Sequence, residues 1–335
     1  LRVVQGFSTA GEYGGAATFM AEYAPDKKRG FWGSFLEVGT LAGFSAALIL
    51  VAVLRYYLGD ATMEAWGWRI PFLVAGPLGG VGLYLRLKME DTPVFRELEE
   101  AGGVEEETTT QFKDLFGKFW RPLLQLFAMV IALNVANYTL LAYMPTYLPT
   151  SIGMEKGTAE VMVLIGQLVM LVLLPFAGSL SDRIGRKPCW WISLGGLFVL
   201  AIPMFMLMAQ GFVLAVIGFT VLGVIYILQL GTISATFPAM FPTHVRFAGM
   251  AISYNIATAA FGGTAPLVND ALVDVTGNNL IPAYYMMGAC VVGMIGLYFM
   301  VETKGASLAG RGIPGVISRP AGRRPGAERP ATELG

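Results

Sequence analysis

The sequence predicts an all-α protein that crosses a membrane several times, and three observations carry that prediction. Hydrophobic residues make up 55% of the 335 positions. Charged residues make up only 14%, whereas soluble domains hold about a quarter. The apolar residues also come in blocks separated by short charged loops, and each block has the length of about 20 residues that a helix needs to cross a bilayer.

Nine segments are long and apolar enough to be predicted as membrane-spanning helices. They are residues 1–23, 30–55, 69–87, 120–146, 158–179, 189–208, 212–238, 247–268 and 281–301. Residues 88–119 carry many glutamates and are predicted to be a linker that holds a short amphipathic helix. Residues 305–335 are rich in Pro, Gly and Arg and are predicted to be a disordered tail.

The basic residues predict the orientation of these helices, because cytoplasmic loops carry an excess of Lys and Arg. Most of them fall on one alternating set of loops, which includes residues 27–29, 86–121, 183–187 and the tail. The opposite set holds Arg2, Arg55, Arg69 and Lys156. The first set is therefore predicted to be cytoplasmic, together with the C-terminus.

An internal repeat relates the first three predicted helices to the last three. Pro25 is followed four residues later by Arg29, and Pro242 by Arg246, each time at the end of an apolar segment. An Ile-Pro pair opens both residues 70–87 and residues 281–301. Such parallel repeats occur in transporters whose two halves enclose a central site. Residues 1–87 are thus predicted to belong to one half, which would lack three preceding helices, and residues 120–304 to form the other.

Several function classes receive no support from the composition. The formal net charge is zero, which gives no argument for nucleic-acid binding, and the chain has one histidine and two cysteines. Neither number nor spacing suggests a metal site or a disulfide framework. A nucleotide-binding loop and a catalytic triad are not recognisable in the sequence, so we expect no enzyme activity and no cofactor.

Three motifs in order resemble the major facilitator superfamily. The loop Gly178–Lys187, GSLSDRIGRK, is similar to the G-x-L-x-D-R-x-G-R-K motif that lies between helices 8 and 9 of that family. Arg2–Gly6, RVVQG, is similar to its helix 4 motif, and Glu302–Gly305, ETKG, to its ending. The resemblance implies a twelve-helix fold of which this chain holds helices 4–12, in a bacterial-type inner membrane.

The resemblance extends to the metabolite:proton symporter branch of the superfamily, and within it to the members that carry proline and glycine betaine. It rests on residues 5–30, 66–72, 90–95, 134–148, 237–246 and 281–285. It implies proton-coupled uptake of a zwitterionic solute by alternating access. Symport of a carboxylate such as 2-oxoglutarate, citrate or shikimate stays open as an alternative, and so does a truncated remnant that transports nothing.

Two acidic residues within apolar segments are candidates for proton coupling. An ionised side chain at bilayer depth costs at least ~2.5 kcal/mol on insertion scales, and Glu12 and Glu37 are predicted to lie there. Each could exchange a proton with the solvent, or merely pair with an arginine or a backbone group. The family resemblance adds Arg2 to the coupling residues.

Polar residues of the segment 120–146 are candidates for substrate binding. In the superfamily, helices 1, 4, 7 and 10 line the cavity, and this segment would be helix 7. A zwitterion needs donors for its carboxylate and aromatic faces for its cationic nitrogen. The candidates are Asn134, Asn137, Tyr138 and Tyr143, with Gln229 from the predicted helix 10. Hydrogen bonding between helices is the alternative role for each of them.

The basic loops orient the helices in the membrane. The family resemblance implies that they also form a gate. It implies that ion pairs of the loop break and re-form as the two halves rock, with Asp182 paired to an arginine that faces it. The predicted gating residues are Asp182, Arg183, Arg186, Lys187 and Arg29.

Overall fold

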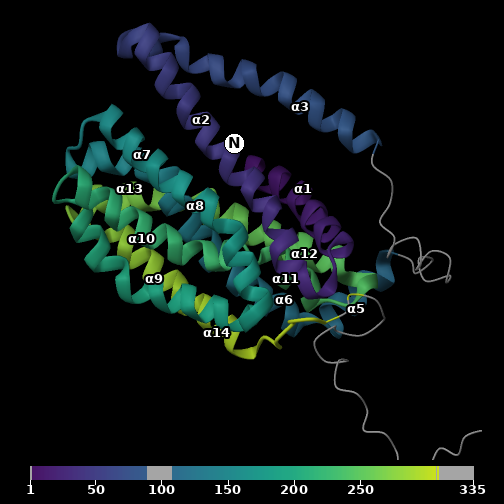
Figure 1. The fold of residues 1–335 in the computed structure, drawn as a ribbon. Helices are drawn as coiled ribbons and strands as arrows, with labels where there is room; N and C mark the ends of the chain where they lie inside the picture. The colour runs from purple at the N-terminus through teal and green to yellow at the C-terminus, as the bar shows by residue number, and fades with distance from the viewer. Residues whose placement is uncertain (1, 89–107, 307, 309–335) are drawn as a thin grey trace, which may run out of the picture.

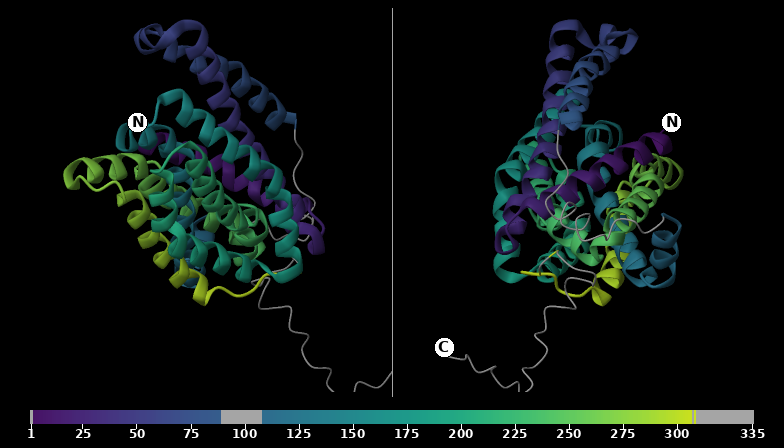
Figure 2. Two further views of the ribbon diagram at one scale, coloured as in Figure 1. Left: turned by 60° about the vertical axis from the view of Figure 1, so that its left-hand side comes forward. Right: turned by 90° about the vertical axis from the view of Figure 1, so that its right-hand side faces the viewer.

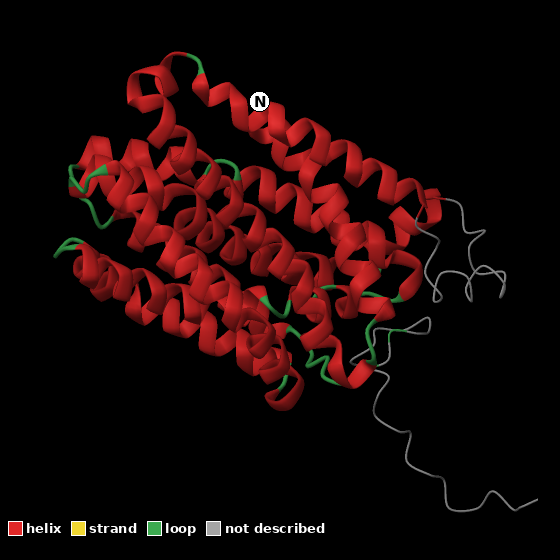
Figure 3. Ribbon diagram, turned by 45° about the horizontal axis from the view of Figure 1, so that its top comes forward, coloured by secondary structure: helices red, strands yellow, loops and turns green. Residues whose placement is uncertain are grey.

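The structure is a computed structural model that describes residues 2–88, 108–306 and 308. Figure 3 shows that the described ranges consist of helices joined by short loops, with no strand among them. This agrees with the predicted all-α class. The apolar blocks form helices because a helix satisfies every backbone N–H and C=O internally, which a lipid environment requires.

The N-terminal part consists of three long helices. They are α1 (Arg2–Tyr23), α2 (Arg29–Ala65) and α3 (Ile70–Lys88), joined by short 3-10 turns at Asp26–Lys28 and Gly67–Arg69. Gly59, with φ of 75°, interrupts the helical geometry of α2. Figures 1 and 2 show α1 and the first part of α2 against the bundle, while α3 lies apart from the bundle and is joined to the far end of α2.

The remaining helices form the main bundle. They are α5 (Thr108–Gly117), α6 (Trp120–Asn137), α7 (Met144–Tyr147), α8 (Lys156–Ile184), α9 (Arg186–Met208), α10 (Phe212–Leu230), α11 (Ile233–Thr236), α12 (Thr243–Ala257), α13 (Ala265–Thr276) and α14 (Ile281–Phe299). Three π-helical turns join some of them, at Tyr138–Tyr143, Leu148–Ile152 and Thr258–Gly262. The helix α5 lies where the short linker helix is predicted.

Six helical stretches of the described chain are long and apolar enough to cross a membrane: Asp26–Ala65, Trp120–Ile152, Lys156–Ile184, Arg186–Met208, Phe212–Thr236 and Ile281–Phe299. Each contains or overlaps a predicted span. The predicted span 247–268 differs, because α12 begins at Thr243, changes to a π turn at Thr258 and continues as α13 to Thr276. Hydrophobicity alone did not reveal that interruption.

The most extensive contacts between the N-terminal helices and the main bundle are those of α2 with α8 and of α1 with α12. The first pair approaches very closely at one end. A Cβ atom added to Gly178 of α8 would lie 2.3 Å from the carbonyl oxygen of Gly30 in α2. Only glycine allows the two backbones to meet there, so this contact fixes the position of α2 on the bundle.

Candidate functional site

A cavity of about 140 Å³ lies where α1, α2, α6, α10 and α12 meet. Its walls are mostly aromatic and amide side chains, with one carboxyl group. The lining residues are Tyr13, Glu37, Thr40, Phe44, Leu133, Asn134, Asn137, Tyr138, Tyr226, Leu230, Ile233, Tyr254 and Thr258. They come from both parts of the molecule, so the cavity exists only because α1 and α2 pack against the main bundle.

Glu37 is the acidic residue of the cavity, and it is 2% exposed. The Tyr13 hydroxyl donates a hydrogen bond to its Oε1 atom. Within the described residues Glu37 forms no ion pair. A charge without a counter-ion is costly in an apolar surrounding, and binding a proton removes that cost.

The aromatic wall combines residues from both repeats. The ring of Tyr13 in α1 stacks on the ring of Tyr254 in α12, with centroids 4.6 Å apart and an interplanar angle of 15°. Tyr226 in α10 donates a hydrogen bond to Oδ1 of Asn137 over 3.0 Å. The Asn137 amide nitrogen makes no hydrogen bond within the described residues, so it can donate to a ligand.

Two π-helical turns shape the wall of the cavity. Tyr138 begins one turn and Thr258 begins the other. Asn134 links them, since its amide nitrogen donates to Oγ1 of Thr258 over 3.0 Å. Gly262 at the end of the second turn leaves room for the Tyr138 ring, because a Cβ atom at Gly262 would lie 2.7 Å from that ring. Such π turns are frequent at functional sites.

Three of the five predicted substrate residues line this cavity, namely Asn134, Asn137 and Tyr138. The other two lie elsewhere. Tyr143 donates a hydrogen bond to Oδ1 of Asp270 over 3.3 Å. Gln229 is fully buried, and neither atom of its amide has a hydrogen-bond partner.

The predicted coupling residues are described only in part. Glu37 lines the cavity. Arg2 and Glu12 belong to α1, but their side chains lie outside the described part of the structure.

Tyr13, Thr40, Tyr226 and Thr258 also line the cavity and were not predicted from the sequence. A weak signal existed for Tyr226, whose hydroxyl is one of the few polar side-chain groups of α10. Tyr13 directly follows Glu12 on a helix rich in small residues. In the part of the chain described here, no cluster of His, Cys, Asp and Glu could hold a metal ion.

The sequence model of the Major Facilitator Superfamily matches residues 1–266. The chain belongs to the major facilitator superfamily. Among curated members, the ectoine/proline transporter of Corynebacterium glutamicum is 41% identical over 322 residues. The proline/betaine transporter of Escherichia coli is 41% identical over 316 residues. The match covers 92% of this chain in both cases, and 64% and 63% of those two proteins.

Solved structures show the same fold. A proton:xylose symporter of the superfamily aligns with a TM-score of 0.65 and 19% identity, over 87% of this chain and 68% of the other. A second structure, a D-xylose-proton symporter, aligns with a TM-score of 0.58 and 22% identity. The chain is thus a multi-pass membrane protein with a major facilitator fold, and it spans about two thirds of the length of the curated relatives it matches.

The superfamily loop between α8 and α9 lies against the start of α2. Both carboxylate oxygens of Asp182 accept hydrogen bonds of 2.9 Å from the backbone N–H groups of Gly30 and Phe31. Asp182 also pairs with Arg186 of its own motif at 2.7 Å. This contact between the two halves is therefore made to the N-terminus of a helix, whose free N–H groups attract an anion, and not to the facing arginine that was expected.

The repeated arginines make equivalent contacts. Nε of Arg29 donates to the carbonyl of Ala21, and Nε of Arg246 donates to the carbonyl of Pro238, each eight residues earlier. Arg29 also pairs with Asp26. Arg246 instead pairs across the repeats with Glu22 of α1 at 2.8 Å, and side-chain exposure of this pair is 1% and 6%. The repeat detected in the sequence is thus visible at the level of single hydrogen bonds.

The segment after α14 closes the same end of the molecule. The Glu302 carboxylate accepts hydrogen bonds from the backbone N–H groups of Arg186 and Lys187 at the start of α9. Nζ of Lys187 donates to the carbonyl of Met300 over 2.7 Å. The carbonyl of Ala306 accepts from Nη1 of Arg29 over 2.8 Å, which joins this segment to α2.

Arg183 differs from the other predicted gating residues. Its side chain is exposed and makes no ion pair within the described ranges, while its carbonyl accepts a hydrogen bond from Nζ of Lys304 over 2.5 Å.

Proposed function

We propose that this protein is a secondary carrier that takes up proline, glycine betaine or a similar zwitterion together with a proton, by alternating access. The observation that carries this proposal is the central cavity, which combines an aromatic and amide lining with a buried carboxyl group that forms no ion pair with a described residue. The names of the relatives at 41% identity agree with it. Because the chain spans only part of their length, the activity of the whole protein is inferred here.

The lining of the cavity suits a zwitterion. The tyrosine rings offer faces to a cationic nitrogen, an interaction of roughly 0.5–2 kcal/mol. The free amide nitrogen of Asn137 can donate to the carboxylate of the substrate. No Lys or Arg is among the described lining residues, which favours a zwitterion over the dianionic substrates that were left open from the sequence.

Glu37 is the proposed proton carrier among the described side chains. Protonation of the Glu37 carboxylate would weaken the hydrogen bond that it accepts from the Tyr13 hydroxyl. The ring of Tyr13 in turn stacks on Tyr254 of the opposite repeat. A proton on Glu37 therefore acts on a contact that joins the two moving parts. Arg2 and Glu12 stay predictions of the sequence for the same coupling.

The basic end of the molecule is the proposed cytoplasmic gate, which also puts the C-terminus in the cytoplasm of a bacterial-type inner membrane. Excess positive charge marks the cytoplasmic side. Asp182, Glu22 and Arg246 join the two repeats at this end, and these contacts must break for release of the substrate inside. The membrane proton gradient supplies the energy.

Uptake tests the proposed substrate. The protein produced from its complete reading frame, in cells without their own proline and betaine carriers, should accumulate labelled proline or glycine betaine, and accumulation should fall when a protonophore is added. Uptake of a dicarboxylate in place of both zwitterions would overturn the proposal.

Glu37→Gln tests the proton carrier. We expect the variant to lose gradient-driven accumulation and to retain exchange of labelled for unlabelled substrate, because exchange needs no net proton movement. Glu64→Gln is the matched control, since Glu64 is exposed and lies outside the cavity, where it contacts Lys156 at 3.4 Å. Normal accumulation by Glu37→Gln would remove Glu37 from the proton path.

A further inference from the structure

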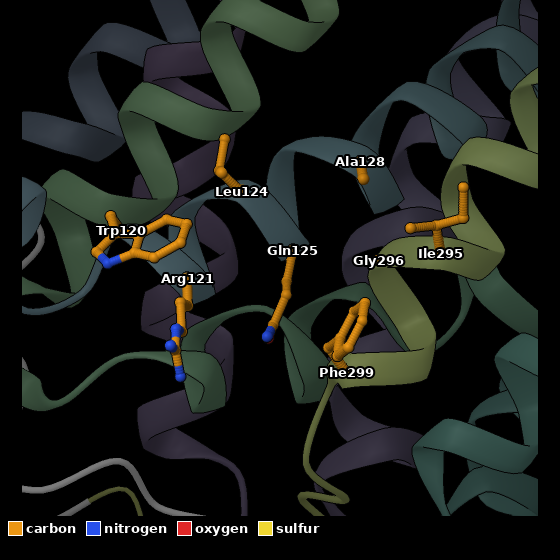
Figure 4. Close-up of a pocket in the computed structure, with 8 residues that line it drawn as sticks. All are labelled: Trp120, Arg121, Leu124, Gln125, Ala128, Ile295, Gly296 and Phe299. Atoms are coloured by element: carbon orange, nitrogen blue, oxygen red, sulfur yellow. The ribbon is translucent and has the colours of Figure 1, made fainter.

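A second and larger hollow, of about 510 Å³, lies on the flank of the main bundle between the start of α6 and the end of α14. We call it the flank groove. It is lined by Trp120, Arg121, Leu124, Gln125, Ala128, Ile295, Gly296 and Phe299 (Figure 4). None of these residues lines the central cavity, so the groove is a separate feature.

The flank groove faces outward. Leu124, Ile295 and Phe299 are 55%, 59% and 63% exposed, which places apolar side chains on the surface that a bilayer covers. The groove also lies at the basic end, because α6 begins there and α14 ends there beside Lys187. Trp120 is 47% exposed at its mouth, and tryptophan is enriched at the level of the lipid headgroups.

The rim of the groove carries a cation, Arg121, that pairs with no described residue. Arg121 is exposed and has no ion pair or hydrogen bond within the described residues, and its guanidinium lies 5.5 Å from the centre of the Trp120 ring. Figure 4 shows Arg121 and Gln125 extending in the same direction from α6. The Gln125 amide likewise makes no hydrogen bond with a described residue.

A smaller annex of about 190 Å³ adjoins the groove and shares Arg121, Gln125 and Phe299 with it. Thr303 lines this annex. It is 2% exposed, and its hydroxyl has no hydrogen-bond partner among the described residues. A buried hydroxyl without a partner costs about 1–3 kcal/mol, which a ligand that offers an acceptor would recover.

We propose that the flank groove binds an anionic phospholipid of the leaflet at the basic end. One acyl chain lies along the apolar wall, the phosphate accepts from the guanidinium of Arg121, and ester or headgroup oxygens reach Gln125 and Thr303. An apolar trough with a cationic rim matches the two ends of such a lipid. A small polar solute could use only the rim, and a zwitterionic lipid would bring its own cation to Arg121.

Lipid binding to the purified protein tests this proposal. The protein in detergent micelles is titrated with phosphatidylglycerol or phosphatidylcholine, and bound lipid is counted by native mass spectrometry. We expect phosphatidylglycerol to bind more tightly than phosphatidylcholine. Arg121→Gln should weaken phosphatidylglycerol binding about fivefold, which corresponds to ~1 kcal/mol for one basic residue near an anionic surface.

Arg69→Gln is the matched control. Arg69 also follows a tryptophan and lies 4.3 Å from the Trp68 ring, but it lies between α2 and α3 at the opposite end. Its replacement should leave binding unchanged. Leu124→Trp should weaken binding by filling the groove without changing charge, and thermal unfolding of each variant without added lipid confirms that it is folded.

Three results would overturn the proposal: equal binding of both lipids, equal loss in Arg69→Gln and Arg121→Gln, or full retention of binding in folded Leu124→Trp. Inorganic phosphate, added alone, separates a lipid site from a site for free anions. If it displaces phosphatidylglycerol at millimolar concentration, the acyl chain contributes little and the lipid assignment is wrong.

Discussion

Single hydrogen bonds hold the wall of the central cavity in one arrangement. The Tyr226 hydroxyl fixes the Asn137 amide by occupying its oxygen, which leaves the nitrogen directed to a ligand. Asn134 is held through its amide nitrogen, which donates to Oγ1 of Thr258. In an apolar helix bundle such bonds specify rotamers as well as contribute stability, because few competing partners exist.

Tyr226→Phe removes only the hydroxyl that fixes Asn137. We expect apparent substrate affinity to fall by roughly fivefold, because a lost hydrogen bond costs about 1 kcal/mol. The maximal rate should change little. Labelled-substrate uptake at several concentrations separates the two quantities. Tyr57→Phe, at a tyrosine that is 78% exposed, serves as the control, and an unchanged affinity in Tyr226→Phe would show that Asn137 needs no such support.

At the scale of elements, the π turns of α6 and α12 decide which side chains reach the cavity. A π turn adds a residue to one turn of a helix and so rotates everything after it relative to a regular helix. The turn at Tyr138–Tyr143 begins with Tyr138 at the cavity and ends with Tyr143, which bonds to Asp270 away from it. A regular α-helix through the same residues would direct a different set of side chains toward the cavity.

Gly262→Ala tests this arrangement, because the added methyl group would lie 2.7 Å from the Tyr138 ring and must displace it. We expect the Michaelis constant for uptake to rise while the protein remains folded. Gly288→Ala is the matched control, since a Cβ atom at Gly288 of α14 meets nothing within 4 Å. Unaltered kinetics in Gly262→Ala would show that Tyr138 does not contact the substrate.

For the whole molecule, ion pairs bridge both ends of the interface between the N-terminal helices and the main bundle. At the basic end, Glu22 pairs with Arg246 in a nearly buried contact. At the other end, Arg55 of α2 pairs with Glu160 of α8 at 2.5 Å. The proposed alternating access requires that these sets of contacts break in turn, so the balance between them would set the population of each state.

Glu22→Gln shifts that balance, because it leaves the buried Arg246 without its anion, a loss of roughly 3 kcal/mol for a buried pair. We expect the basic end to open more often. Spin labels at Lys27→Cys and Ile184→Cys, which span α1/α2 and α8, report this as a longer distance. Both native cysteines are buried, which limits their labelling. Asp274→Asn, at an exposed residue of α13, should leave the distance unchanged. An equal distance in Glu22→Gln would argue against a gate at this pair.

The sequence by itself determined the helical class, the repeat and the family, because each depends on local residue order. Apolar blocks must become helices in lipid, and the equivalent contacts of Arg29 and Arg246 follow from equivalent sequence. The sequence also indicated Glu37 and the five substrate candidates as polar residues in apolar segments, and three of those five line the cavity.

Only the tertiary structure decided which of these residues meet. Tyr13 and Tyr254 are distant in the chain, and their stacking depends on how α1 packs against α12. The π turns that admit Tyr138 and Thr258 and turn Tyr143 away have no hydrophobic signature. Gln229 is fully buried although it is polar, so exposure to the cavity could not be derived from residue type. Long-range packing and helix register set these positions, and neither is encoded in a local pattern.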